Sequence, residues 1–271
     1  MPRIVVYPYK IKSNSAVKLK EYLAEEGAEA LLVYPDRAYR PHPDDLIIGW
    51  GSGDWPSWKR RAEEAECTWL NPSDTINNAI NKIETFNLFR AAHIPCPEWT
   101  TRSYIAMRWV REGHTVLARQ ELGGRDGAGL VVITNEREFV PAELYTKYEN
   151  KISEFRVHVF NGEAFWAQER VPIEEEDNRF YRENPNQQIR TSSNGWTLYV
   201  ANRHCPSVCK AAAIAAVTAL GLDFGAVDIG WKKRTTTGVL ADTCVYEVNT
   251  APELTNRTCS AYVQQILSIR G

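Results

Sequence analysis

The first 70 residues alternate short apolar runs with a helical segment. The runs at residues 4–7, 30–34 and 46–50 are apolar without a polar residue at every second position. Parallel strands that are covered on both faces have this composition. The pattern therefore predicts a small parallel sheet built from strand–helix–strand units.

The helix between the first two strands has sequence signals at both ends. Ser13 or Ser15 is suited to cap its start, because a serine hydroxyl accepts a hydrogen bond from an amide of the first turn. The helix is expected to end near Glu26, since Gly27 readily adopts the left-handed conformation found there. The third strand leads into Gly-Trp-Gly-Ser-Gly-Asp at 49–54, which is either a substrate-contacting loop or a tight turn that needs glycine.

A second long helix is expected over residues 71–92, where closely spaced prolines then impose an extended linker. The pattern changes to antiparallel strands after it, with apolar runs at 115–119 and 130–133. Gly-Gly-Arg-Asp-Gly-Ala-Gly at 123–129 separates these runs and has more glycine than a tight hairpin turn requires. A loop whose backbone amides wrap a phosphate is one interpretation of that excess.

The clearest β-hairpin lies at residues 155–167. Apolar and other side chains alternate over 155–160, and Asn-Gly follows, a dipeptide that favours the tight turns of hairpins. The apolar face is expected to join the core, while Arg156 and His158 are expected to face a cleft or solvent.

The C-terminal hundred residues begin with a polar segment and continue with a predicted helix and two predicted strands. Residues 172–196 are polar and irregular, and their four consecutive acidic residues are interpreted as part of a solvated loop. A helix is expected over 206–220, followed by strands at 224–231 and 244–250 with a turn at 235–238.

Two carboxylates lie within these last apolar strands, Asp228 and Glu247. Burying an unpaired carboxylate is unfavourable, so such a group requires a cation or strong hydrogen-bond donors. Glu247 and Asn249 share one face because side chains alternate along a strand, and Asp228 joins them if the strands pair antiparallel. Each acid taken alone suits an edge strand facing solvent, but the three oxygen donors together favour a Mg²⁺ site.

The composition makes some classes of function less expected than others. The chain is 44% hydrophobic and 24% charged, with a net charge of −2, which gives no reason to expect a nucleic-acid partner. No apolar run approaches the roughly 20 residues that span a bilayer, and no export signal is recognised, so a cytoplasmic location is expected. The six cysteines form no zinc pattern and are expected to be reduced.

The order of these motifs resembles the ATP-grasp superfamily, whose members include ribosomal-protein glutamate ligases, glutathione synthetases and D-alanine–D-alanine ligases. A lysine on the lead-in helix, a strand that ends in a basic residue before a glycine loop, a hinge, and then Asp and Glu-x-Asn follow one another over residues 71–265. The signatures Glu-Phe-Arg-Val-His-Val at 154–159 and Glu-Val-Asn-Thr-Ala-Pro at 247–252 are most similar to compact phage and bacterial members.

The resemblance implies an α/β chain with the ATP-grasp fold. Residues 1–70 would form a small N-terminal βαβ lobe, and residues 71–145 and 146–271 would form two α+β lobes that clasp ATP. ATP and Mg²⁺ would be the cofactors. The metal would be held by Asp228, Glu247 and Asn249.

The resemblance also implies which residues bind the nucleotide. Lys82 and Arg119 would hold the phosphates under the glycine loop that contains Gly124 and Gly127. The family usually has lysine where this chain has Arg119, and a planar guanidinium contacts phosphate differently from a compact ammonium. The hinge and ribose contacts would come from Tyr145, Thr146, Lys147 and Glu154.

The implied activity is carboxylate–amine ligation, in which ATP converts a carboxylate into an acyl phosphate that an amine then attacks. Arg156 would contact the transferring phosphoryl group with help from Arg170, and Arg190 and Asn194 would steady the acyl phosphate or the acceptor unless they are ordinary loop residues. The partners would be small-molecule or peptide carboxylates and amines, with a homodimer left open. A small-molecule kinase and a non-catalytic nucleotide-binding protein are the alternatives.

Overall fold

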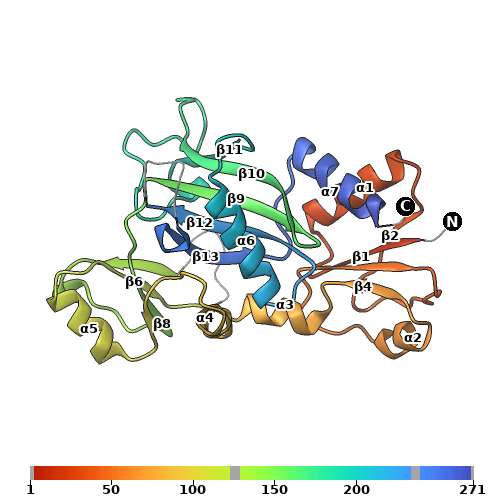
Figure 1. Cartoon of the computed structure of the whole chain (residues 1–271), viewed down its shortest axis with the longest axis horizontal. Helices are drawn as coiled ribbons and strands as arrows, with labels where there is room; N and C mark the ends of the chain where they lie inside the picture. The colour runs from red at the N-terminus through yellow and green to blue at the C-terminus, as the bar shows by residue number, and fades with distance from the viewer. Residues whose placement is uncertain (1–2, 123–128, 233–238, 270–271) are drawn as a thin grey trace.

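The computed structural model describes residues 3–122, 129–232 and 239–269, which form three sheets along an elongated molecule (Figure 1). A small lobe with α5 lies at one end, the N-terminal lobe lies at the other, and the largest sheet lies between them. Gly124 and Gly127 fall outside the described residues. Within the described part of the chain, no helix is long and apolar enough to cross a membrane.

The N-terminal lobe is a four-stranded parallel sheet in the order β2-β1-β3-β4. Every residue of β1 and β3 is buried, which confirms that these apolar runs are covered on both faces. The short strand β4 was not predicted, because three residues show no periodicity. The elements are β1 (Ile4–Pro8), α1 (Asn14–Glu25), β2 (Ala30–Leu32), β3 (Leu46–Trp50), α2 (Lys59–Glu64) and β4 (Thr68–Leu70).

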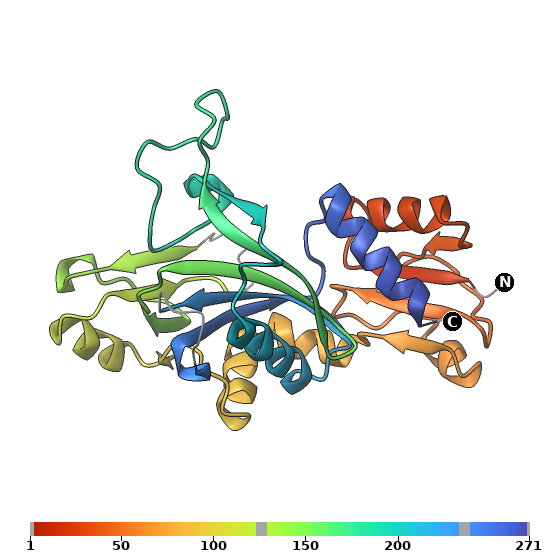
Figure 2. The same cartoon turned by 45° about the horizontal axis from the view of Figure 1, so that its top comes forward.

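The C-terminal helix α7 (Asn256–Ser268) packs beside α1 on this N-terminal sheet (Figure 2). Tyr262 and Ile266 of α7 are fully or almost fully buried in the same apolar cluster as Leu19 and Leu23 of α1. The two ends of the chain therefore share one core, and the N-terminal lobe is joined to the rest of the molecule on two sides.

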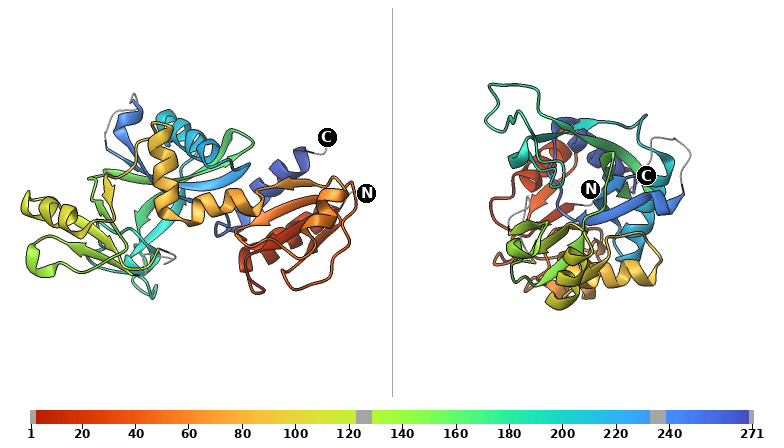
Figure 3. Two further views of the ribbon diagram at one scale, coloured as in Figure 1. Left: turned by 90° about the horizontal axis from the view of Figure 1, so that it is seen from below. Right: turned by 90° about the vertical axis from the view of Figure 1, so that its left-hand side faces the viewer.

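The predicted single helix over 71–92 is wrong, since the structure has two helices there, α3 (Ser73–Ile80) and α4 (Lys82–Ala91) (Figure 3). Asn81 leaves helical geometry with ψ 101°, and its Oδ1 accepts from the backbone amides of Ile83 and Glu84. Asparagine is among the strongest residues for capping a helix start. Lys82 is therefore the first residue of the second helix.

The joint between the first lobe and the large sheet is made by Asn71, which is fully buried with a positive φ of 50°. Its Oδ1 accepts from the amides of Asp223 and Phe224 at 2.8 and 3.2 Å, and its Nδ2 donates to the Phe224 carbonyl at 2.9 Å. A Cβ on Gly49 would collide with the Asn71 carbonyl, and one on Gly51 would lie 2.7 Å from Cβ of Ala251. Close packing at these lobe contacts therefore explains the glycines of the 49–54 loop.

The small lobe is an antiparallel sheet in the order β5-β8-β6-β7, which confirms the predicted change of strand direction. The helix α5 packs its buried Ala106, Trp109 and Val110 on this sheet. The elements are β5 (Trp99–Thr100), α5 (Ser103–Arg111), β6 (Val116–Arg119), β7 (Leu130–Ile133), the 3₁₀ turn at Glu136–Glu138 and β8 (Leu144–Lys147).

The largest sheet is antiparallel, in the order β11-β10-β9-β12-β13, and α6 lies across one of its faces (Figure 1). The predicted hairpin is confirmed: Asn161 and Gly162 join β9 to β10 with φ of 46° and 78°, as a type I′ turn requires. The elements are β9 (Ser153–Phe160), β10 (Glu163–Pro172), the 3₁₀ turn at Ser192–Asn194, β11 (Trp196–Val200), α6 (Ser207–Ala219), β12 (Phe224–Trp231), the 3₁₀ turn at Leu240–Asp242 and β13 (Thr243–Asn249).

Candidate functional site

A row of polar side chains crosses the largest sheet on the face away from α6. Gln168 of β10 pairs with Arg156 of β9, Arg156 pairs with Asp228 of β12, and Asp228 pairs with Glu247 of β13. Directly paired residues point to the same face of a sheet. The antiparallel pairing of the last two strands, the condition on which the expected Mg²⁺ site depended, is present and places Asp228 beside Glu247.

The two carboxylates of this row are held by cations from different elements. Asp228 accepts two hydrogen bonds from Arg156, at 2.7 and 2.8 Å, and a longer one from Arg170 at 3.4 Å. Glu247 accepts from Lys82 Nζ at 2.8 Å, and the Lys82 charge holds the pKa of Glu247 well below its ordinary value. Burial lowers the pKa of Arg156, but the charge and hydrogen bonds of Asp228, with the charges of Glu247 and Glu154, together outweigh it and the net pKa is raised. Glu247 and Arg156 are therefore both charged at neutral pH.

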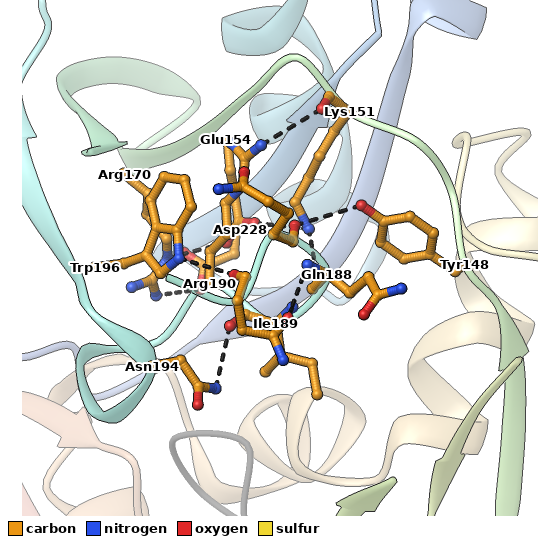
Figure 4. A network of polar contacts seen from close by, with 12 residues as sticks. Tyr148, Lys151, Glu154, Arg170, Gln188, Ile189, Arg190, Asn194, Trp196 and Asp228 are labelled. Atoms are coloured by element: carbon orange, nitrogen blue, oxygen red, sulfur yellow. Dashed lines mark hydrogen bonds and ion pairs between the residues drawn. The ribbon is translucent and has the colours of Figure 1, made fainter. Parts of the chain in front are cut away.

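A third carboxylate, Glu154, lies beside this row between two cations (Figure 4). Its Oε2 lies 3.0 Å from Lys151 Nζ and its Oε1 lies 2.9 Å from Arg170 Nε. The exposed fractions of these three side chains are 8%, 5% and 10%. Burial lowers the pKa of Lys151 despite the opposing charge of Glu154. This part of the site is thus a closed network of charges that bulk water hardly reaches.

Arg190 and Asn194 lie on the loop between β10 and β11, which Figure 4 shows against this network. Arg190 is buried, stacks 4.5 Å over the Trp196 ring and donates to the Ile152 carbonyl at 3.3 Å. Within the described residues it has no carboxylate partner, and its Nε has no hydrogen-bond partner. Asn194 donates to the Ile189 carbonyl at 3.1 Å, so its amide nitrogen holds the loop itself.

The hinge side chains have partners in the small lobe. Tyr145 is buried in that core, where its hydroxyl contacts the backbone of residues 140 and 142. Lys147 forms an ion pair with Glu98 at 2.7 Å. Thr146, between Tyr145 and Lys147 in β8, is half-buried. The backbone of this strand is also engaged, since β8 pairs with β5 on one side and with β6 on the other.

The phosphate-binding residues expected from the resemblance lie near Glu247. Lys82 contacts it directly, and the half-buried Arg119 at the end of β6 is close enough for its charge to lower the pKa of Glu247. The helix α4 and the small-lobe strand β6 thus bring two cations to one carboxylate of the large sheet. The glycine loop between β6 and β7 lies in residues that the structure does not describe, except for Gly129.

The expectation that His158 faces a cleft or solvent is wrong. His158 is fully buried, with Nδ1 3.1 Å from the Tyr262 hydroxyl of α7 and Nε2 3.1 Å from Oε1 of Gln168. The sequence pattern showed only which strand face carries His158, and α7 covers that part of the face. Burial, with the nearby Arg156 charge, lowers the pKa of His158 to about 3.

Sequence reasoning missed three residues of the site: Lys151, Gln168 and Tyr246. Lys151 and Gln168 gave no signal because a lone lysine or glutamine usually faces solvent. Tyr246 sits at a break in the strand register, where Asp228 pairs with Glu247 but the next residue, Ile229, pairs with Val245. Tyr246 is the extra residue of a β-bulge, which period-two alternation cannot predict.

The donor set of Asp228, Glu247 and Asn249 suits a hard cation such as Mg²⁺, which prefers a few protein oxygens and completes its shell with phosphate and water. Nδ2 of Asn249 donates to Glu247 at 3.2 Å and to the Ala226 carbonyl at 3.4 Å, which leaves Oδ1 as the free acceptor of that amide. No cluster of three His, Cys, Asp or Glu occurs among the described residues, so the set is two carboxylates and an amide.

The site has more positive than negative charge. Three carboxylates, Glu154, Asp228 and Glu247, face a larger set of cations. The cations are Lys82, Arg119, Lys151, Arg156, Arg170 and Arg190. Since burying uncompensated charge is unfavourable, the surplus favours an anionic ligand such as a polyphosphate or a carboxylate.

No protein-family model matches the chain, and no curated protein matches it. Solved structures do match over nearly the whole chain. The ATP-grasp ligase PsnB, complexed with minimal precursor, Mg and ADP, has 16% identity and a TM-score of 0.67, with 98% of this chain and 96% of that chain covered.

Two further structures have the same architecture. The D-alanine–D-alanine ligase from Bacillus anthracis complexed with ATP has 14% identity and a TM-score of 0.65, with 99% of this chain and 98% of that chain covered. The macrocyclase MdnC from Microcystis aeruginosa MRC, bound with precursor peptide MdnA, has 12% identity and a TM-score of 0.60, with 98% and 99% covered. These likenesses confirm the predicted ATP-grasp fold for this chain.

Proposed function

We propose that this chain is an ATP- and Mg²⁺-dependent ligase that joins a carboxylate to an amine. The observation that carries the proposal is the excess of cations around Asp228 and Glu247, on the sheet of an ATP-grasp fold. A nucleoside triphosphate with a bound cation matches both parts of such a site. Its phosphates balance the surplus cations, and its cation balances the carboxylates.

The nucleotide would lie between the small lobe and the large sheet. Lys82 and Arg119 would contact its phosphates, with Gly124 and Gly127 on the loop above them. The hinge at Tyr145, Thr146 and Lys147 would lie against the base. Glu154 would accept from ribose hydroxyls, because each of its oxygens has one cation partner and retains acceptor capacity.

Asp228, Glu247 and the Oδ1 of Asn249 would hold Mg²⁺, which supplies charge neutralisation of the phosphate oxygens when bound. In the structure the oxygens of Asp228 are bonded to Arg156, and Glu247 is bonded to Lys82. A cation held here would have to share those oxygens with the two basic side chains. Arg156 and Lys82 would then turn part of their donor capacity toward phosphate.

The chemistry needs no protein nucleophile. An oxygen of the substrate carboxylate attacks the γ-phosphorus, the bond to the β–γ bridging oxygen breaks, and ADP leaves. The amine then attacks the acyl carbon, phosphate leaves with the carboxylate oxygen, and the amine loses a proton. Arg156 and Arg170 would stabilise the charge on the transferring phosphoryl group, which is the main task of a protein in such a transfer.

The joined molecules are proposed to be peptides or small molecules. The PsnB and MdnC structures hold precursor peptides, and the third relative is a D-alanine–D-alanine ligase. In this chain Arg190 is the buried cation without a carboxylate partner among the described residues, so it would bind the acyl phosphate or the carboxylate of the acceptor. Asn194 would act by fixing the loop that carries Arg190.

The test is turnover with a panel of carboxylates and amines in the presence of ATP and Mg²⁺. The expected result is ADP release that depends on both substrates, together with a product whose mass equals their sum less one water. A reaction without amine is the control. A stable phosphorylated product that forms without any amine, or binding of ATP without turnover across peptides and amino acids, would contradict the ligase.

A further inference from the structure

Lys151 lies where the hinge, the large sheet and the 173–195 loop meet. Its side chain is 5% exposed, although it belongs to the short link between β8 and β9, residues 148–152. Figure 4 shows the side chain pointing into the polar network from the hinge side. Removing a lysine ammonium from water is unfavourable, so contacts inside the protein must compensate for the lost hydration.

The first contact of Lys151 is with the sheet. Its Nζ lies 3.0 Å from Oε2 of Glu154, which is the first site residue of β9. The other oxygen of Glu154 belongs to Arg170. The carboxylate is therefore fixed from both sides, and its orientation depends on Lys151.

The second contact is with the loop between β10 and β11, which extends from the body of the molecule (Figure 2). Nζ of Lys151 donates to the Gln188 carbonyl at 3.1 Å. Two neighbouring contacts support it: the Tyr148 hydroxyl donates to the Gln187 carbonyl at 3.4 Å, and Arg190 donates to the Ile152 carbonyl at 3.3 Å. Residues 187–190 are thus held along residues 148–152.

Aromatic rings complete the surroundings of the ammonium. Nζ lies 5.5 Å from the centre of the Tyr148 ring and 5.0 Å from that of Tyr246. Tyr246 stands next to Glu247 on β13, so Lys151 contacts the same strand that carries the predicted metal ligand. Cation–π contacts of a buried ammonium are stronger than those at the surface.

An ordinary structural ion pair would not have this set of partners. Lys232 and Glu149 form such a pair at 2.9 Å, with 30% and 32% of their side chains exposed, at the other end of the same link. The Lys151 ammonium instead contacts two elements: the Glu154 carboxylate of β9 and the Gln188 carbonyl of the long polar loop between β10 and β11.

We propose that Lys151 is a positioning residue: one ammonium orients Glu154 for the nucleotide and holds residues 187–190 against the hinge. The proposal rests on the nucleotide binding proposed above. Since both contacts use the same group, nucleotide binding and closure of the 173–195 loop are coupled through it, and coupling between two sites is reciprocal.

The test compares the wild type with Lys151→Met, which keeps the apolar stem and removes the charge, and with Lys232→Met as the matched control. Hydrogen exchange is measured at the amides of Gln188 and Ile189, both of which donate to the Asn186 side chain. ATP affinity is measured in parallel by calorimetry. Lys151→Met is expected to exchange these amides about tenfold faster or more and to bind ATP about tenfold more weakly, since a buried hydrogen bond to a charged group is lost.

Lys232→Met is expected to stay within about twofold of the wild type in both measurements, because its ion pair is open to water and contacts neither Glu154 nor the 173–195 loop. Unchanged exchange or unchanged ATP affinity in Lys151→Met would overturn the proposal. A wild-type experiment gives a second criterion, since saturating ATP is expected to slow exchange at Gln188 and Ile189, and no slowing also overturns it. If the wild type binds no ATP at all, the proposed function fails, while the exchange in Lys151→Met still tests the contact with the loop.

Discussion

Acid is expected to destabilise this protein through His158 before it does so through Glu247 of the site. The imidazole is fully buried between β9 and α7, with a pKa of about 3 against an ordinary value of 6.5. Burial is the main cause, and the Arg156 charge adds to it. Because the folded protein holds the neutral ring, the stabilisation is complete above pH 6.5 and is lost as the pH falls from there toward about 3.

The size of the effect follows from the two pKa values. Each pH unit between them removes about 1.4 kcal/mol of folding free energy, so roughly 2 kcal/mol is lost between pH 7 and pH 5. That is a large part of the ~5–15 kcal/mol that stabilises a typical domain. Glu247 and Asp45 also have lowered pKa values, but their contributions are lost only below the ordinary values of 4.5 and 3.8.

The assay is urea unfolding of the wild type and of His158→Gln at pH 7 and pH 5. Glutamine keeps a donor and an acceptor near Tyr262 and Gln168, so the variant is expected to fold with a lower but nearly pH-independent stability over this interval. The reasoning is refuted if the wild type loses less than about 0.5 kcal/mol, or if His158→Gln loses as much as the wild type.

Three other substitutions test separate features. Asn71→Ala removes the joint of the lobes and leaves buried backbone groups unpaired, so urea unfolding is expected to show a loss of about 2–4 kcal/mol, whereas Asn87→Ala on the exposed face of α4 stays within about 0.5 kcal/mol. Gly230→Ala places a Cβ against the Tyr246 hydroxyl and is expected to lower the free energy of unfolding by about 1–3 kcal/mol. The double variant with Tyr246→Phe is expected to recover part of that loss, and equal stability of the single and double variants would contradict the contact. Glu247→Gln is expected to lower ligase turnover at least about 100-fold with ATP affinity within about tenfold, while Glu253→Gln, an exposed residue, leaves both unchanged; wild-type turnover in Glu247→Gln would remove it from the site.

The sequence alone predicted those elements that depend on the order of neighbouring residues. Apolar runs without alternation predicted the parallel strands, and Asn161-Gly162 predicted the hairpin. The break at Asn81 was missed because helical periodicity continues across it, and only the capping contacts show that the chain stops and starts again. His158 was placed on the correct strand but not in the core, since the helix that covers it lies 104 residues later in the chain.

In the candidate site, too, individual residues could be predicted from the sequence but their partners could not. Charged residues in apolar strands indicated Asp228 and Glu247, because such residues need partners. Their partners could not be identified from spacing: Lys82 is 165 residues from Glu247, and Arg156 is 72 residues from Asp228. Lys151 is close to Glu154 in sequence, but its contact with the Gln188 carbonyl arises only when the 173–195 loop folds back on the hinge.

The bulge at Tyr246 is what makes the local pattern and the site agree. Cys244 pairs with Gly230 and Val245 with Ile229, so an unbroken strand would next pair Tyr246 with Asp228 and Glu247 with Val227, whose side chain is in the core beneath α6. The extra residue shifts the register, and Glu247 pairs with Asp228 instead. Gly230 gives the Tyr246 ring the room it needs on the site face. Deletion of Tyr246 would close the bulge and still pair Glu247 with Asp228 on the site face, so the Lys82–Glu247 pair is expected to survive the deletion.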